Sequence, residues 1–249
     1  MEPELPNPYA APSTHHTPAE STGPDLPAGR YGPYRDNRRL ARWLVGLLAF
    51  GIAVHAARIA VNFVYSFSPL LDDEKRTEQV ESVFGLFQLA AIGCMIVFAV
   101  WIVRSAKNAW LFAELRRQGA RIGASEAPAF PNDSPGWALG WYFIPIVSFW
   151  KPFGAMRDIV RVSTLDSGLA GWLLPVWWTL WLASLVLDRV ATKLATAAAE
   201  WEALHQLVFW TSVSGIEIAL HTVAVLLVGG LTRLQTETAR VLATPEATP

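Results

Sequence analysis

Two groups of polar side chains interrupt long apolar runs of this chain, and each group follows i, i+3, i+7 spacing. They are His55, Arg58 and Asn62 in the first run and Ser214, Glu217 and His221 in the second. Side chains at this spacing share one face of an α-helix. An imidazole can exchange protons with a carboxylate near neutral pH, and a guanidinium can neutralise a carboxylate. The two groups therefore predict either a structural ion pair or a site that handles protons or small solutes.

The depth of these residues in a membrane favours pairing. Ionisable side chains are costly inside a bilayer, so they usually face the interior of a helix bundle and pair with one another. At about 1.5 Å per residue, Arg58 and Glu217 lie at one depth if the chain crosses the membrane four times. His55 and His221 then also lie close together. We expect Arg58 and Glu217 to neutralise each other, and the alternative is a proton- or solute-linked site that uses Glu217 with both histidines.

The elements that carry these residues are membrane helices. The chain has 249 residues, of which 52% are hydrophobic and 16% are charged, whereas ordinary globular domains have about 25% charged residues. A helix needs roughly 20 residues to cross the hydrocarbon core. The sequence therefore predicts an all-α, polytopic membrane helix bundle. Its five apolar segments are Trp43 to Phe67, Ser82 to Val103, Gly136 to Trp150, Gly168 to Leu187, and Leu207 to Leu231.

The third segment is too short for an ordinary span and contains Pro145. Basic residues mark the cytoplasmic side of a membrane protein, and they gather before the first segment and between Arg104 and Arg121. If the third segment dips in and returns, the basic stretch after Lys151 stays on that side. We predict four full spans plus a short re-entrant or interfacial third segment, with both termini cytoplasmic; five spans are the alternative. Phe153, Met156 and Val160 recur at helical spacing, which favours an interfacial helix from Lys151 to Ser163.

The two ends of the chain differ in composition from the rest. Residues 1–39 are rich in proline and contain no apolar run, so we predict a disordered cytoplasmic tail rather than a cleaved leader. Residues 40–240 form the predicted membrane bundle, and residues 241–249 form a second disordered tail. His15 and His16 lie in the first tail, where an isolated pair of histidines does not predict a metal site.

One aromatic motif interrupts the third segment and resembles a known family. The motif reads Pro-Gly-Trp-Ala-x-Gly-Trp-x-Phe-x-Pro-Ile over residues 135–146 and is followed by a further proline. It is similar to the signature of a bacterial multi-pass membrane family, the domain of unknown function numbered 4328, and the similarity runs from about Leu40 to Arg240. The family has no assigned biochemistry, so the resemblance implies a bacterial plasma membrane but no activity. The residues that carry it are Pro135, Gly136, Trp137, Ala138, Gly140, Trp141, Phe143, Pro145, Ile146 and Pro152.

The usual catalytic and cofactor motifs are missing. The sequence contains no His-Glu-x-x-His, no Gly-x-Ser-x-Gly, no phosphate loop and no dinucleotide fingerprint. The single cysteine, Cys94, excludes an intrachain disulfide framework. The net charge of −1 does not favour nucleic acid. We therefore expect no enzyme activity, no cofactor and no metal.

Three function classes remain, in order of preference. The first is a non-catalytic membrane scaffold that binds anionic lipid head groups, or a protein partner through its proline-rich tail or its basic loop at residues 104–121. The second is a small proton- or solute-linked transporter or channel that uses the Arg58, Glu217 and His221 cluster. The third is an intramembrane enzyme. The sequence leaves self-association open.

Overall fold

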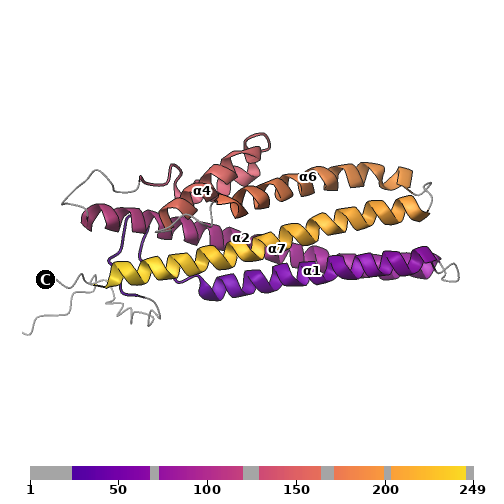
Figure 1. Ribbon diagram of the computed structural model, residues 1–249, viewed down its shortest axis with the longest axis horizontal. Coiled ribbons are helices and arrows are strands. Elements are labelled where there is room, and N and C mark those ends of the chain that lie inside the picture. The colour runs from indigo at the N-terminus through magenta and orange to yellow at the C-terminus, as the bar shows by residue number, and fades with distance from the viewer. Residues whose placement is uncertain (1–23, 68–72, 120–128, 164–170, 199–202, 245–249) are drawn as a thin grey trace, which may run out of the picture.

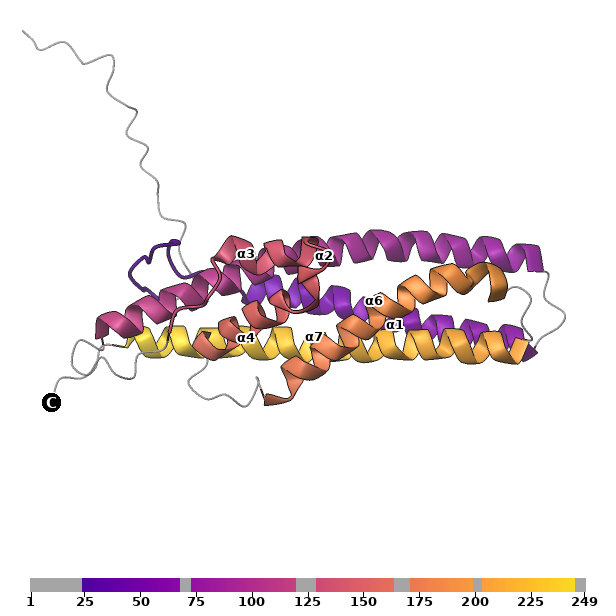
Figure 2. The same cartoon turned by 90° about the horizontal axis from the view of Figure 1, so that it is seen from above.

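The computed structural model describes residues 24–67, 73–119, 129–163, 171–198 and 203–244, and the statements below concern those residues. Four long helices lie side by side as an elongated bundle (Figure 1). Short elements between the second and third long helices lie against one half of that bundle (Figure 2). The long helices are α1 (Arg38–Phe67), α2 (Asp73–Gly119), α6 (Leu173–Ala198) and α7 (Ala203–Ala243). The short elements are α3 (Pro135–Gly140), η1 (Trp141–Phe143), η2 (Val147–Phe149) and α4 (Lys151–Ser163).

Each long helix contains a stretch that is long and apolar enough to cross a membrane. These stretches are Arg38–Val64, Leu89–Gly119, Leu173–Val190 and Leu207–Ala243. The predicted all-α fold with four spans is therefore confirmed. The helices run up and down, so that α1 begins and α7 ends at the same end of the bundle (Figure 1).

The third apolar segment does not form a continuous helix. Pro135 starts α3, where its missing N–H costs nothing. Ile144 is extended, with φ −96° and ψ 110°, as expected for a residue that precedes a proline. The segment is divided into α3, η1 and η2, and Pro145 lies in the break between η1 and η2. Among the described residues this segment therefore forms no helix long enough to span a bilayer, and the four-span arrangement holds.

The apolar face of α4 packs against protein. Met156, Ile159 and Val160 are at most 1% exposed, and the helix contacts α2 and α7. Arg157 and Arg161 remain exposed on the opposite face. The amphipathic pattern predicts an interfacial helix, and in the structure its apolar face packs against α2 and α7.

Burial divides the bundle into two halves. In the half that contains α4, large apolar side chains such as Trp101, Phe112 and Leu231 are fully buried. Away from that half, Phe63 and Ile92 are among the exposed large apolar residues, at 58% and 53%. At about 1.5 Å per residue α2 is roughly 70 Å long, which far exceeds a hydrocarbon core of about 30 Å. The exposed apolar half around Phe63 and Ile92 therefore suits lipid. The packed half has a protein core but also exposes apolar residues such as Trp43, at 65%.

The ordered body is longer at both ends than the sequence predicted. Residues 24–37 were assigned to the disordered tail, but Leu26 and Asn37 are buried. Tyr31 meets Trp110 edge-on at 5.3 Å between ring centroids, so an aromatic contact ties this segment to α2. A turn with Gly32 at φ 105° directs the chain along that helix. At the other end, α7 continues to Ala243, and residues 1–23 lie outside the described residues.

The predicted basic loop is a helix. Residues 104–119 continue α2 without a break, because they contain alanine, leucine, arginine and glutamate and no proline. The basic side chains of this stretch are therefore held on a rigid element that packs against α4 and α7.

Candidate functional site

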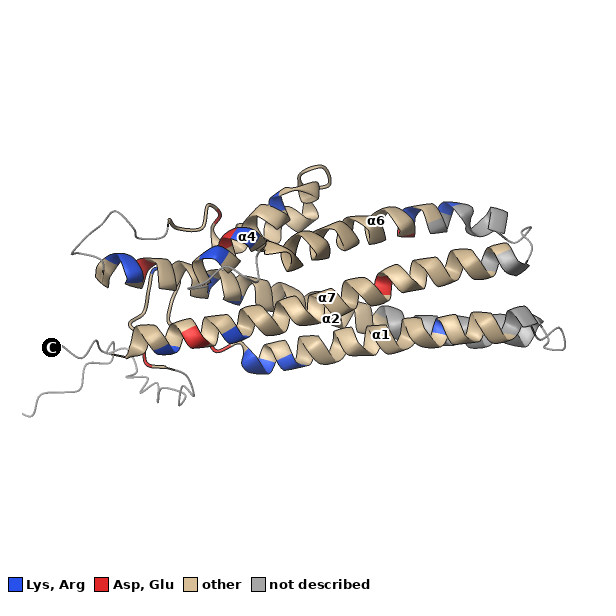
Figure 3. Ribbon diagram, viewed as in Figure 1, with Lys and Arg blue, Asp and Glu red and all other residues tan. Residues whose placement is uncertain are grey.

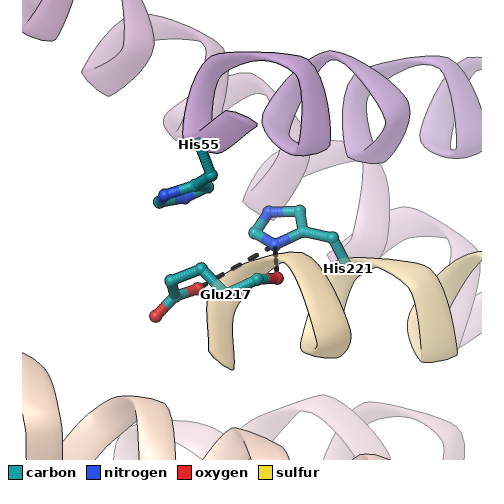
Figure 4. Close-up of side chains that lie close together, drawn as sticks. All are labelled: His55, Glu217 and His221. Carbon is teal, nitrogen blue, oxygen red and sulfur yellow. Dashed lines mark hydrogen bonds and ion pairs between the residues drawn. The ribbon is translucent and has the colours of Figure 1, made fainter. Parts of the chain in front are cut away.

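Two histidines and a glutamate meet between α1 and α7. His55 extends from α1, and Glu217 and His221 extend from adjacent turns of α7 (Figure 4). The candidate ligand atoms of the three side chains lie within 4.8 Å of one another. The rings of His55 and His221 are 5.7 Å apart between centroids. The antiparallel pairing of α1 and α7 thus joins residues that are far apart in the sequence.

Hydrogen bonds orient the two groups on α7. The Nδ1 atom of His221 lies 2.7 Å from the backbone carbonyl oxygen of Glu217 and 3.9 Å from its Oε2 atom. The hydroxyl of Ser184 on α6 donates to Oε1 of Glu217 at 2.5 Å. Three helices therefore build this site. The sequence does not predict Ser184 as a site residue. The only feature that could have indicated it is a hydroxyl group within an apolar segment that has no charged residue.

The site is largely enclosed by protein. His55 is 6% exposed, and the side chains of His221 and Glu217 are 18% and 19% exposed. Gly51, one turn before His55, makes room for the second ring: a Cβ there would lie 2.7 Å from Cδ2 and Nε2 of His221. Ser214, which the sequence placed on this face, is fully buried.

Arg58 and Asn62 continue the same face of α1 beyond His55. The guanidinium of Arg58 lies over the ring of Trp210, 4.6 Å from its centroid, and Glu217 acts on it electrostatically. Asn62 is half-buried one turn further along. Glu217 therefore contacts His221 and Ser184 directly and also lies in the field of Arg58. A carboxylate between imidazoles can exchange protons with them, and two imidazoles with a carboxylate also form a ligand set for divalent transition metals.

The aromatic motif forms a compact turn beside α2 and α6. Trp137 and Trp141 stack with centroids 4.5 Å apart, and a Cβ at Gly140 would lie only 3.0 Å from the ring of Trp137. Tyr142 meets the edges of Phe98 on α2 and Trp181 on α6 at 5.7 and 5.8 Å. Gly140, Trp137 and Trp141 of the motif thus pack against one another. Of the other motif residues, Pro135 and Pro152 are buried, and Gly136, Phe143 and Pro145 are exposed.

This turn and the helices α2 and α6 beside it lie within the region matched by a known family. The model of the family described as domain of unknown function (DUF4328) matches residues 71–233. The chain belongs to this family. No curated protein and no solved structure matches the chain. The matched region of this DUF4328 protein includes Ser184, Glu217 and His221 but not α1, which contributes His55.

The packed half of the DUF4328 protein contains a buried polar network that the sequence analysis missed. Gln235 on α7 is 1% exposed. Its amide nitrogen donates to the carbonyl oxygen of Ser105 and to the hydroxyl of Ser163, both at 2.9 Å, and its oxygen accepts from Asn108 at 3.3 Å. Asn108 also exchanges two hydrogen bonds with the backbone of Arg35. This network joins the N-terminal segment, α2, α4 and α7. In the sequence it is indicated only by amide and hydroxyl side chains at helical spacing.

Basic side chains gather at the packed end of the DUF4328 protein. Figure 3 shows Lys and Arg on the start of α1, the last part of α2, α4 and the end of α7. A groove of about 540 Å³ opens between α1 and α7 at this end. It is lined by Arg38, Arg42, Arg233 and Arg240 together with Glu237 and apolar residues. Within the groove Arg233 pairs with Glu237 at 2.8 Å.

Proposed function

We propose that this DUF4328 protein is a non-catalytic scaffold of the bacterial plasma membrane that binds anionic phospholipid head groups with its basic end on the cytoplasmic side. The groove between α1 and α7 is the single observation that carries the proposal. Four arginines and one glutamate give this groove a net positive charge. A basic pocket between membrane helices on the cytoplasmic side suits an anionic lipid head group.

The distribution of charge supports the orientation. Lys and Arg on the cytoplasmic flank of spans set topology, and the described ends of α1, α2 and α7 carry them together (Figure 3). The apolar lining of the groove, which includes Val45 and Gly229, continues toward the exposed apolar half of the bundle. A lipid can therefore place its phosphate among the arginines and its acyl chains along the helices.

The scaffold part of the proposal rests on rigidity. The polar network of Gln235 and Asn108 fixes the N-terminal segment against α2 and α7, so the described chain begins at the basic end. A tail anchored beside an anionic leaflet suits docking of a partner protein.

Lipid retention tests the proposal. The purified protein in detergent is mixed with phosphatidylglycerol or phosphatidylcholine, and bound lipid is counted by native mass spectrometry. We expect preferential retention of phosphatidylglycerol. Each basic residue near an anionic leaflet contributes about 1 kcal/mol, so the double variant Arg42→Gln/Arg240→Gln should bind it at least tenfold more weakly.

A charge-matched control distinguishes this groove from general attraction. Arg189 and Lys193 lie on α6 away from the groove and are exposed, so Arg189→Gln/Lys193→Gln should leave retention unchanged. Equal retention of the two lipids by the wild type, or equal losses in both double variants, would contradict the proposed head-group site.

A proton- or solute-linked transporter is the second candidate, and the His55, Glu217 and His221 cluster favours it. The cluster lies between spans and includes groups that can exchange protons. Proteoliposomes with a pH-sensitive dye inside provide the test. Proton flux that disappears in Glu217→Gln at an unchanged protein level would replace the scaffold with a transporter.

A further inference from the structure

We propose that His55, Glu217 and His221 form a binding site for one divalent transition metal ion of the zinc class within the membrane half of the bundle. The proposal rests on a different observation from the head-group groove, so each can fail without the other. It requires convergent ligands, partners that orient them, and a contact that positions the His221 ring.

The ligands converge from two helices. Two imidazole nitrogens and one carboxylate oxygen lie within 4.8 Å of one another, and His55 supplies the ligand from α1 (Figure 4). In a tetrahedral zinc site with bonds of about 2.0–2.2 Å, ligand atoms lie roughly 3.4 Å apart. Rotation of the long Glu217 side chain and small movements of the rings can close this difference. Water can fill the fourth position, as in other sites with two histidines and a glutamate.

Hydrogen bonds to Glu217 and His221 favour the metal-bound arrangement of these side chains. When His221 donates from Nδ1 to the Glu217 carbonyl oxygen at 2.7 Å, its other nitrogen, Nε2, keeps a lone pair that can bind a metal. Nε2 lies against Gly51, so metal binding requires a small shift of the ring. Ser184 donates to one carboxylate oxygen of Glu217 and leaves the second oxygen to face the histidines. Metal-bound histidines and carboxylates usually have such partners, which fix their orientation.

Ligand chemistry selects the class of ion. Imidazole suits zinc, copper, nickel and iron, whereas magnesium and calcium prefer sites made of oxygen ligands. The positive charge of Arg58 opposes binding of a cation, because Arg58 lies on the same face of α1 as His55 and interacts with Glu217. Its guanidinium is held over Trp210 at 4.6 Å from the ring centroid, however, so the arginine has an aromatic partner in addition to the carboxylate.

The position of the His221 ring depends on the absence of a side chain at Gly51. A Cβ at position 51 would lie 2.7 Å from both Nε2 and Cδ2 of the ring, which forces the imidazole to move. Gly46 lies on the same helix and has nothing within 4 Å of an added Cβ. These two glycines therefore provide a matched pair of substitutions that leave all three ligands in the chain.

Cobalt binding tests the site, because tetrahedral Co²⁺ absorbs visible light more strongly than octahedral Co²⁺. The chain has five histidines, so the background is the full chain with His15→Ala, His16→Ala and His205→Ala, which leaves only His55 and His221. We expect this background to bind one Co²⁺ per chain with a tetrahedral spectrum and Zn²⁺ to displace it. His221→Ala and Glu217→Gln should each weaken binding at least tenfold.

Substitutions outside the ligand set sharpen the result. Gly51→Ala should weaken Co²⁺ binding, whereas Gly46→Ala should not. Ser184→Ala should weaken it about 10- to 100-fold, as removal of a ligand's hydrogen-bond partner usually does. No uptake at a hundred-micromolar concentration of Co²⁺ or Zn²⁺, or uptake equal in the background and in Glu217→Gln, would overturn the proposal.

X-ray absorption spectroscopy tests whether two histidines bind the metal, and it does not require the ligand variants to fold. Zinc added to the histidine-depleted background should show the outer-shell scattering of two imidazoles. A zinc environment of oxygen ligands alone would overturn the proposal.

Discussion

The imidazole ring of His221 lies against the backbone of Gly51, so closely that a Cβ at position 51 would be 2.7 Å from two ring atoms. Gly51 belongs to α1 and His221 to α7, the two helices with the most extensive contact in the bundle. This close approach sets the position of the ring beside His55 and Glu217. The absence of a side chain on one helix thus helps to build the polar site on the other.

Gly51→Ala should destabilise the protein by about 1–3 kcal/mol, because an added methyl group in a filled interface forces side chains and backbone to shift. Thermal unfolding in detergent is the measurement. Gly46→Ala on the same helix meets no neighbour and should leave the free energy of unfolding unchanged or slightly higher, because alanine favours the helix over glycine. Equal effects of the two substitutions would show that the Gly51–His221 contact does not constrain the interface.

Glu217→Gln and Arg58→Gln should each destabilise the protein, and the double variant should recover part of the loss. Removal of one member of a buried charge pair leaves the other uncompensated, which is the expensive state. The four proteins form a double-mutant cycle measured by thermal unfolding. Glu217 acts electrostatically on Arg58, but it also accepts from Ser184 and lies near His221, so only partial recovery is expected. Strictly additive losses would show that the two charges are not energetic partners.

Gln235→Leu should cost several kcal/mol while it keeps the side-chain volume similar. The substitution leaves Asn108, the carbonyl of Ser105 and the hydroxyl of Ser163 without this partner in a buried environment, and each buried polar group without its partner costs about 1–3 kcal/mol. Gln118→Leu on the exposed last turn of α2 is the matched control. Similar unfolding temperatures for the two variants would contradict a structural role for the network.

Asp36 should contribute stability that acid removes. Burial opposes its ionisation, but hydrogen bonds from the side chain and backbone N–H of Arg38, at 2.7 and 2.9 Å, lower the pKa of Asp36 below its usual value of 3.8. A folded-state pKa below the unfolded one means that the contribution is fully present well above 3.8 and is lost progressively as the pH falls from about 5 through the folded-state pKa. The difference in unfolding temperature between the wild type and Asp36→Asn should therefore shrink between pH 6 and pH 3. The exposed Asp25 supplies the control substitution, Asp25→Asn.

The orientation in the membrane can be tested with single cysteines in a Cys94→Ala background. His205→Cys near the start of α7 should react with an impermeant maleimide in intact cells, because that end of the bundle is expected to face outward. Thr244→Cys, just after α7 ends at Ala243, should react only after permeabilisation. The reverse pattern would place the basic end outside and remove the proposed contact with the cytoplasmic leaflet.

The helical membrane architecture was predictable because it depends on local properties of the chain. Hydropathy over about 20 residues identifies a span, and a proline within a short apolar run predicts a break. The four spans and the interrupted segment around Pro145 follow from these properties alone. The i, i+3, i+7 spacing of His55 and Arg58, and of Glu217 and His221, likewise placed each set on one helix face.

Long-range packing determined the remaining features. Ser184 reaches Glu217 only because α6 lies beside α7, and Tyr31 orders the segment before α1 only because Trp110 is there to meet it. The sequence of the basic stretch after Arg104 is compatible with a loop or a helix, and packing of α2 against α4 and α7 stabilises the helix. A periodic pattern shows which face of a helix is polar, but the antiparallel register of α1 and α7 decides which imidazole meets which carboxylate. That register is set by contacts such as Gly51 with His221, which join residues far apart in the chain and which no local spacing encodes.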